Sequence, residues 1–172
     1  ARALSARTSV RHRVKCMDRL LGNGTLQRQG VAIYGAMAAQ VLAGCSQPVI
    51  LIDWSDLKAD RSVQMIRASL ALQGRSLTLL EQVCSARQAA TRGTHARFLR
   101  HLKAIVGDQA RPIIVTDAGF HAPWFAAVEQ LGWHWLGRIR GRDLVRPAGD
   151  SQARWMSCRG VWAAATATPA DL

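Results

Sequence analysis

The sequence predicts an α/β fold in which helices flank a mixed β-sheet. Three observations lead to this prediction. Short apolar runs rich in Val and Ile recur along the chain, and such runs are typical of buried strands. The first runs follow one another across short turns, which predicts antiparallel hairpins, whereas the later runs alternate with helical patterns, which predicts parallel strands. A basic helical stretch precedes all of them.

Residues 1–46 are expected to form a basic helical extension. Apolar residues recur at helical spacing in its first half, and Gly22 and Gly24 mark the end of that helix. A second helix is predicted over residues 25–43. The first helix carries cations that are candidate contacts for a DNA backbone, with a solvated helix face as the alternative: Arg11, Arg13 and Lys15.

Residues 47–172 are expected to form the core, with elements in the order β-β-β-α-β-α-β. The predicted strands are 49–53, 62–72, 76–83, 112–116 and 133–140, and the predicted helices are 94–106 and 122–131. In the last strand, Arg138 and Arg140 are expected on one face. Beyond Arg142 the pattern is weak, and it fits either two short strands or the beginning of an insertion.

Charge is the strongest signal in the composition. The 172 residues include 23 Lys and Arg against 11 Asp and Glu, a net charge of +12. This excess favours a polyanionic partner, above all nucleic acid, although an Arg-rich composition can also follow genome base composition. The four cysteines are widely spaced with no C-x-x-C pair, which favours reduced thiols in a cytoplasmic protein over a zinc site. The sequence contains no charge-free apolar stretch of about 18 residues, so it predicts no membrane span.

Two apolar strands each begin after a proline and each lead to an aspartate. The first reaches Asp53 in PVILIDWSDL, and the second reaches Asp117 in PIIVTDAGFHAPWF. An aspartate at the end of a strand often caps the following turn or helix. Two such carboxylates brought together would repel each other unless a cation neutralised them, and Mg²⁺ prefers oxygen ligands of this kind. The repeated layout therefore predicts a metal site, with capping as the alternative.

Four segments carry a resemblance to a known family. LIDWSDL, PIIVTDAGFHAPWF and GWHWLGRIRGR, with RHRVKCMDRLLGN upstream, resemble bacterial insertion-sequence transposases of the DDE type, the insertion-sequence-four-like group. The resemblance implies a ribonuclease-H-like core in which two Asp and one Glu hold two Mg²⁺ ions, with Mn²⁺ as a substitute, for DNA cleavage and strand transfer. It implies that Asp53 and Asp117 are the two aspartates. Arg138 and Arg140 are candidate phosphate contacts, with solvated edge charges as the alternative.

The resemblance also implies partners and a location. The partner would be double-stranded DNA at the transposon ends, the full-length form would be a homodimer, and the protein would be cytoplasmic and associated with the bacterial nucleoid.

The third acid of the resemblance has no match in this chain. The only glutamates are Glu81, in the third predicted strand, and Glu129, on the helix directly after Asp117, and neither matches the Glu motif. We therefore expect a chain truncated before the third ligand. One alternative is a catalytically inactive remnant that only binds DNA. Another is a phosphatase with a strand-end Asp nucleophile, but Ser55 occupies the position where such an enzyme needs a second Asp.

Overall fold

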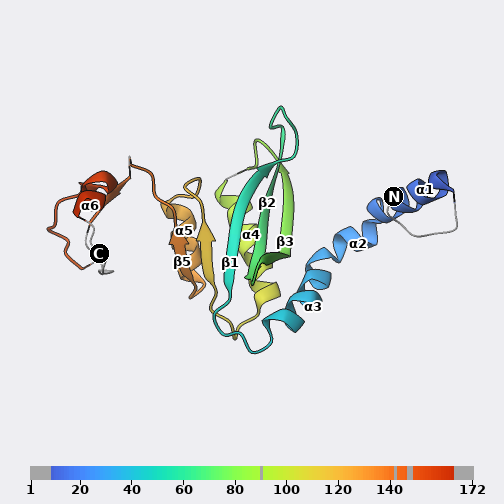
Figure 1. The fold of residues 1–172 in the computed structure, drawn as a ribbon, viewed down its shortest axis with the longest axis horizontal. Coiled ribbons are helices and arrows are strands. Elements are labelled where there is room, and N and C mark those ends of the chain that lie inside the picture. Colours follow the sequence, from blue (N-terminus) through green and yellow to red (C-terminus); the bar gives the residue numbers. More distant parts are fainter. Residues whose placement is uncertain (1–8, 90, 142, 147–148, 165–172) are drawn as a thin grey trace.

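A five-stranded mixed sheet forms the centre of the molecule. The computed structural model describes residues 9–89, 91–141, 143–146 and 149–164. Its strands are β1 (Val49–Asp56), β2 (Val63–Leu72), β3 (Arg75–Ser85), β4 (Ile113–Thr116) and β5 (His134–Gly137), in the spatial order β3-β2-β1-β4-β5 (Figure 1). The first three strands pair antiparallel, whereas β1 with β4 and β4 with β5 pair parallel. The prediction of a mixed sheet in a ribonuclease-H-like α/β fold is confirmed.

The direction of the chain across the sheet reverses between β1 and β4. Two hairpins carry the chain from β1 through β2 to β3 at one edge, and the second hairpin turns at Gly74, whose φ of 75° suits glycine. The following helix then returns the chain to β4, on the other side of β1. In open α/β sheets, ligands bind outside the carboxyl ends of the strands at such a reversal.

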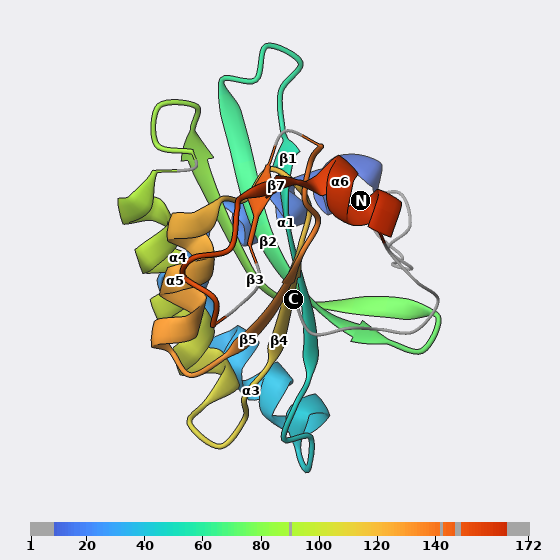
Figure 2. The same cartoon turned by 90° about the vertical axis from the view of Figure 1, so that its left-hand side faces the viewer.

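Helices α4 (Arg92–Val106) and α5 (Ala122–Gln130) cover one face of the sheet (Figure 2). The Thr91 hydroxyl caps α4 by accepting a hydrogen bond from the Thr94 amide, and Pro123 lies in the first turn of α5, where its missing N–H costs nothing. The apolar stripes of the two helices pack on the sheet around Phe98 and Trp124, which are both almost fully buried.

The N-terminal part of the chain forms three helices. They are α1 (Val10–Leu21), α2 (Gly24–Arg28) and α3 (Gly30–Leu42). The single helix predicted over 25–43 is wrong, because the α-helix is interrupted at Gln29. Helix α3 contacts α4 and β3 and adds Ala38 and Leu42 to the core, whereas α1 buries no residue and extends beyond the β3 edge of the sheet (Figure 1).

The C-terminal part differs from prediction at β5. This strand ends at Gly137, so the predicted strand over 133–140 is too long and Arg138 and Arg140 lie in the segment that follows it. Gly137 packs closely against the ring of Phe125 on α5. Beyond it, β6 (Leu144–Val145) and β7 (Met156–Ser157) pair antiparallel and α6 (Cys158–Ala164) follows. The weak pattern of this segment therefore corresponds to two short strands. Within the described residues, no helix is long and apolar enough to cross a membrane.

Candidate active site

Asp53 and Asp117 lie at neighbouring positions of two parallel strands. Residues 49–52 of β1 pair with residues 113–116 of β4, so each aspartate is the next residue after the last paired position, Ile52 with Thr116. Strand β1 itself continues to Asp56, because it still pairs with β2 there. Since Ile52 faces the covered side and side chains alternate along a strand, Asp53 projects to the open face of the sheet.

The two carboxylates have few partners of their own. Asp117 accepts a hydrogen bond on one oxygen, Oδ1, from the Gly119 amide at 2.9 Å, which fixes the turn that follows β4. Within the described part of the chain, the Asp53 carboxylate accepts no hydrogen bond, and neither aspartate forms an ion pair. The capping alternative is therefore correct for the turn after Asp117. It does not extend to α5, whose N-cap residue is His121 and makes no side-chain capping bond.

A row of charged residues crosses the open face at the level of the two aspartates. Arg67 of β2 is paired directly with Asp53, and Glu81 of β3 is paired directly with Arg67. On the other side, Arg138 follows Gly137, which is paired with Thr116, and the Arg138 amide donates to the Thr116 carbonyl at 3.1 Å. The order across the sheet is therefore Glu81, Arg67, Asp53, Asp117 and Arg138.

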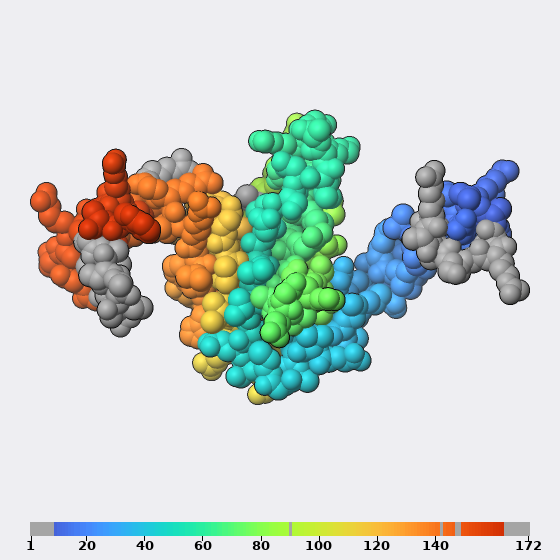
Figure 3. Space-filling model, in the orientation of Figure 1, coloured from blue at the N-terminus to red at the C-terminus, as the bar shows by residue number. Residues whose placement is uncertain are grey.

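The β1–β2 hairpin projects beyond the end of β4, so the surface steps down from the hairpin to the carboxyl ends of the parallel strands (Figure 3).

The sequence of the chain matches the transposase DDE domain family over residues 44–159, about two thirds of its length. The chain belongs to this family. A comparison with the curated proteins finds no match. The matched range includes all five strands and both aspartates, so the acid pair lies within the transposase domain.

Beneath the acids, the covered face of this transposase domain carries an aromatic cluster. Trp54, next to Asp53, and Phe120, three residues after Asp117, both contact the ring of His95 on α4, with ring centroids 6.1 and 5.9 Å apart. The Trp124 ring packs edge-on against His95 at 4.9 Å. Burial lowers the pKa of His95, so the ring stays neutral in this apolar layer. The cluster therefore joins the two acid-bearing segments from below.

The remaining predicted cation sites do not converge on the acids. Arg11 and Lys15 are exposed on α1, and Arg13 is half-buried there. Figure 1 shows α1 beyond the β3 edge, whereas Asp53 lies in β1 and Asp117 directly follows β4. Arg140 is exposed, and its amide donates to the Asp143 carboxylate. The structure thus brings Arg138 beside the acid pair and leaves the α1 cations apart from it.

Other carboxylates are engaged elsewhere. Asp56 lies on the opposite side of β1 from Asp53, accepts a hydrogen bond from Gln64 at 2.8 Å and pairs with Arg61 at 3.3 Å. Glu129 accepts from the Trp135 indole at 2.9 Å. Within the described ranges, no group of three or more His, Cys, Asp or Glu side chains could hold a metal ion.

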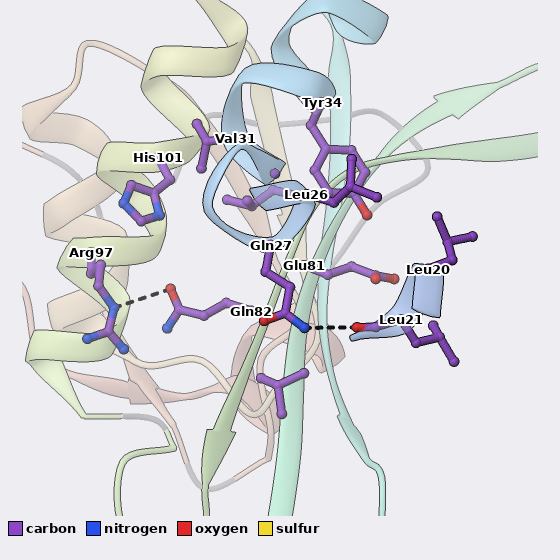
Figure 4. A pocket seen from close by; sticks show the side chains of 13 residues that line it. Leu20, Leu21, Leu26, Gln27, Val31, Tyr34, Glu81, Gln82, Arg97 and His101 are labelled. Atoms are coloured by element: carbon purple, nitrogen blue, oxygen red, sulfur yellow. Dashed lines mark hydrogen bonds between the residues drawn. The ribbon is translucent and has the colours of Figure 1, made fainter. Parts of the chain in front are cut away.

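A groove of about 890 Å³ lies away from the acids, between helices α1–α3 and strand β3 with α4 (Figure 4). Leu26 and Val31 line it from the helices, and Glu81 and Arg97 line it from β3 and α4. Burial and the nearby Glu81 charge raise the pKa of Tyr34, which also lines the groove, while Arg67 lowers that pKa. Neither Asp53 nor Asp117 lines this groove, so the groove is separate from the candidate active site.

Sequence reasoning missed Arg67 and the aromatic cluster. Arg67 is the only charged residue in the apolar run of β2, VQMIRASLAL, which marks it as facing away from the core. That signal could have drawn attention to it. Its position opposite Asp53 depends on the register of the β1–β2 hairpin, which the local pattern does not contain.

Proposed function

We propose that this chain is part of an insertion-sequence transposase of the insertion-sequence-four-like group from a bacterium. In this proposal it binds double-stranded DNA at transposon ends and catalyses metal-dependent cleavage and strand transfer. Asp53 and Asp117 are the metal-binding carboxylates. The observation that carries the proposal is the register of β1 with β4, which brings two carboxylates without ion pairs to the point where the sheet order reverses.

The donor set suits a hard divalent cation such as Mg²⁺, with Mn²⁺ as a substitute. All the donors are carboxylate oxygens, and only one of the four, Asp117 Oδ1, accepts a hydrogen bond. When bound, the cation would stabilise negative charge on the reacting phosphate oxygens. The protein residues contribute fixed positions, because strand pairing holds Asp53 and the turn to Gly119 restrains Asp117.

The cations around the acids supply binding rather than chemistry in this proposal. Arg138 contacts a backbone phosphate beside Asp117, and Arg140 contacts one further along the segment after β5. The exposed cations of α1, Arg11 and Lys15 together with Arg13, contact the DNA backbone at a distance from the acids. The net charge of +12 supports an electrostatic contribution to binding by all of them.

We further propose a division of labour along the chain. Residues 1–46 act as a basic helical extension, and residues 47–172 act as part of the catalytic domain, in a protein that works as a homodimer on nucleoid DNA in the cytoplasm. The contact of α3 with α4 and β3 supports a fixed attachment between the two parts.

A second candidate function is DNA binding without turnover. It is favoured because Asp53 and Asp117 lack a third metal ligand. Arg67 neutralises Glu81, and within the described residues no third ligand lies beside the two aspartates. Two carboxylates can hold one Mg²⁺ whose remaining positions are filled by water, but they hold a second ion weakly. Strand transfer by the 172-residue chain alone is therefore expected to be poor.

A nicking assay on supercoiled plasmid separates these functions. With Mg²⁺ or Mn²⁺ present, nicking by the parent chain is expected to fall by about 10²–10³-fold in Asp53→Asn and in Asp117→Asn. Asp56→Asn is the matched control, because it removes the same charge from the other side of β1. Nicking that survives in both variants would contradict the proposal. DNA binding with no nicking by any chain would select the second candidate.

A further inference from the structure

We propose that Arg67 holds a backbone phosphate of the bound DNA on the β2 side of the Asp53–Asp117 pair. The inference rests on the proposed function, because it takes DNA as the ligand, and it adds a residue to the site. It also gives the direction in which a DNA strand crosses the sheet.

Arg67 projects to the open face of the sheet beside Asp53. It lies directly opposite Asp53 in the antiparallel pair of β1 and β2, and directly opposed residues project to the same face of a sheet. Its side chain is 46% exposed even though β2 is an interior strand of the sheet. A guanidinium is therefore available to a ligand one strand away from the first acid.

Glu81 holds one side of the Arg67 guanidinium. Its Nε donates to Glu81 Oε1 at 2.7 Å, across the pair of β2 and β3. Arg67 forms no ion pair with Asp53, and its two Nη nitrogens have no partner in the part of the chain that the structure describes. Glu81 therefore restrains the side chain and leaves its remaining donors open. An arginine fork of this kind suits the geometry of a phosphate.

The charges around the two acids also favour a cation beside them. A phosphate that approaches Asp53 and Asp117 meets two carboxylates without ion pairs, which repel it. Arg67 on one side and Arg138 on the other are the cations in register with these acids, so they offset the repulsion at the same level of the sheet. Replacing either by a neutral residue removes one side of this balance.

The spacing of the two arginines suits a single DNA strand. Arg67 and Arg138 are separated by three inter-strand steps, which amounts to roughly 14 Å at the usual strand spacing. At a rise of about 3.4 Å per nucleotide, this corresponds to roughly four nucleotides. A DNA strand that crosses the β-strands would thus place phosphates on both arginines and an intervening phosphate at the acids.

The test is duplex binding over a series of salt concentrations, without divalent metal. Arg67→Ala is expected to lower the slope of log K against log salt by about one unit, because one phosphate contact is lost. Arg75→Ala is the matched control. It removes the same charge, but Arg75 lies at the start of β3, toward the end of the sheet opposite the acids, so the slope is expected to stay unchanged. A purely structural role for Arg67 would not lower the slope.

Two further variants protect the interpretation. In a Glu81→Gln background, Arg67→Ala is expected to cost the same unit of slope, which excludes repulsion by an exposed Glu81 as the cause. Arg67→Lys keeps the charge and is expected to keep the slope but to bind less tightly, since Lys lacks the fork.

The outcomes distinguish the inference from the proposed function. Equal slopes for Arg67→Ala and Arg75→Ala would overturn the phosphate contact while duplex binding by the parent chain stands. Equal affinity of Arg67→Lys and the parent would overturn the forked contact. A parent chain that binds no duplex even at low salt would overturn both the inference and the proposed DNA partner.

Discussion

The two faces of β1 differ in almost every property. On the side covered by α4 and α5, Ile50 and Ile52 are buried and Trp54 contacts the His95 ring. On the other side, Leu51 is 41% exposed and Asp53 is exposed. One strand therefore anchors the fold through Ile50, Ile52 and Trp54 on its covered face. It presents the Asp53 carboxylate on its open face.

This difference shows that one strand can serve both the core and the candidate site. The buried face fixes the backbone of β1, so the carboxylate on the open face is held without packing of its own. The same holds for β4, where Ile114 is fully buried and the aspartate follows at the end of the strand. Substitutions on the covered face should therefore change stability, whereas substitutions on the open face should change binding.

The largest expected effect comes from neighbouring residues on opposite faces of β1. Ile50→Ala is expected to lower the free energy of unfolding by about 2–5 kcal/mol, because it leaves a cavity in the core. Leu51→Ala, its matched control, should cost about 1 kcal/mol, because much of that side chain is already exposed. Denaturant unfolding of both variants measures the difference, and equal losses would contradict the assignment of the two faces.

A smaller loss is expected at the end of β5. In Gly137→Ala the new Cβ would lie 2.5 Å from Cζ of Phe125, whose ring is itself packed on Trp135, so it cannot move away freely. Overpacking of this kind costs about 1–3 kcal/mol. Gly141→Ala serves as the control, since no atom lies within 4 Å of the position that its new methyl group would take. Thermal unfolding would argue against this packing if both variants melted with the parent.

The covered face should also respond to pH through His95. Burial lowers the pKa of this ring in the folded chain, whereas the unfolded chain protonates it near the ordinary value of 6.5. The unfolded state therefore binds more protons below about 6.5, and the free energy of unfolding falls there until the lowered folded pKa is passed. Denaturant unfolding above and below this value should show a weaker pH dependence in His95→Phe. If the pH dependence is the same in His95→Phe as in the parent, folding does not lower the pKa of His95.

The open face should affect DNA binding with the smallest change in stability. Arg138→Ala combined with Arg140→Ala should flatten the salt dependence of duplex binding by about one unit for each lost contact. The control, Arg75→Ala with Arg111→Ala, removes the same charge near the other end of the sheet. Salt-independent binding by the parent, or equal slopes for the two double variants, would count against a DNA path over the segment after β5.

Local patterns predicted most elements of the fold, because each rests on side chains close in sequence. The two strands before the acids have the same length from proline to aspartate, and the pairing of Val49 with Ile113 turns that shared layout into adjacent acids. Two errors concern where elements end. The α-helix is interrupted at Gln29, and β5 ends at Gly137, which lies against the Phe125 ring of α5.

The charged row shows what sequence patterns cannot supply. Arg67 stands out in an apolar strand, but its place beside Asp53 requires the hairpin register across the loop between β1 and β2. Glu81 matches no motif in the sequence, and only the pairing of β3 with β2 shows that it holds Arg67. Contacts between strands distant in sequence define this part of the site.

The most direct test of the metal site is to measure binding of Mn²⁺, used in place of Mg²⁺, to the 172-residue chain by electron paramagnetic resonance. The parent is expected to bind the ion, and Asp53→Asn and Asp117→Asn should each weaken that binding strongly, because each removes a carboxylate from the shared site. Asp56→Asn should bind as the parent does, since that carboxylate is engaged with Gln64 and Arg61. Binding that is unchanged in both Asp53→Asn and Asp117→Asn would contradict the claim that these two aspartates form a metal site.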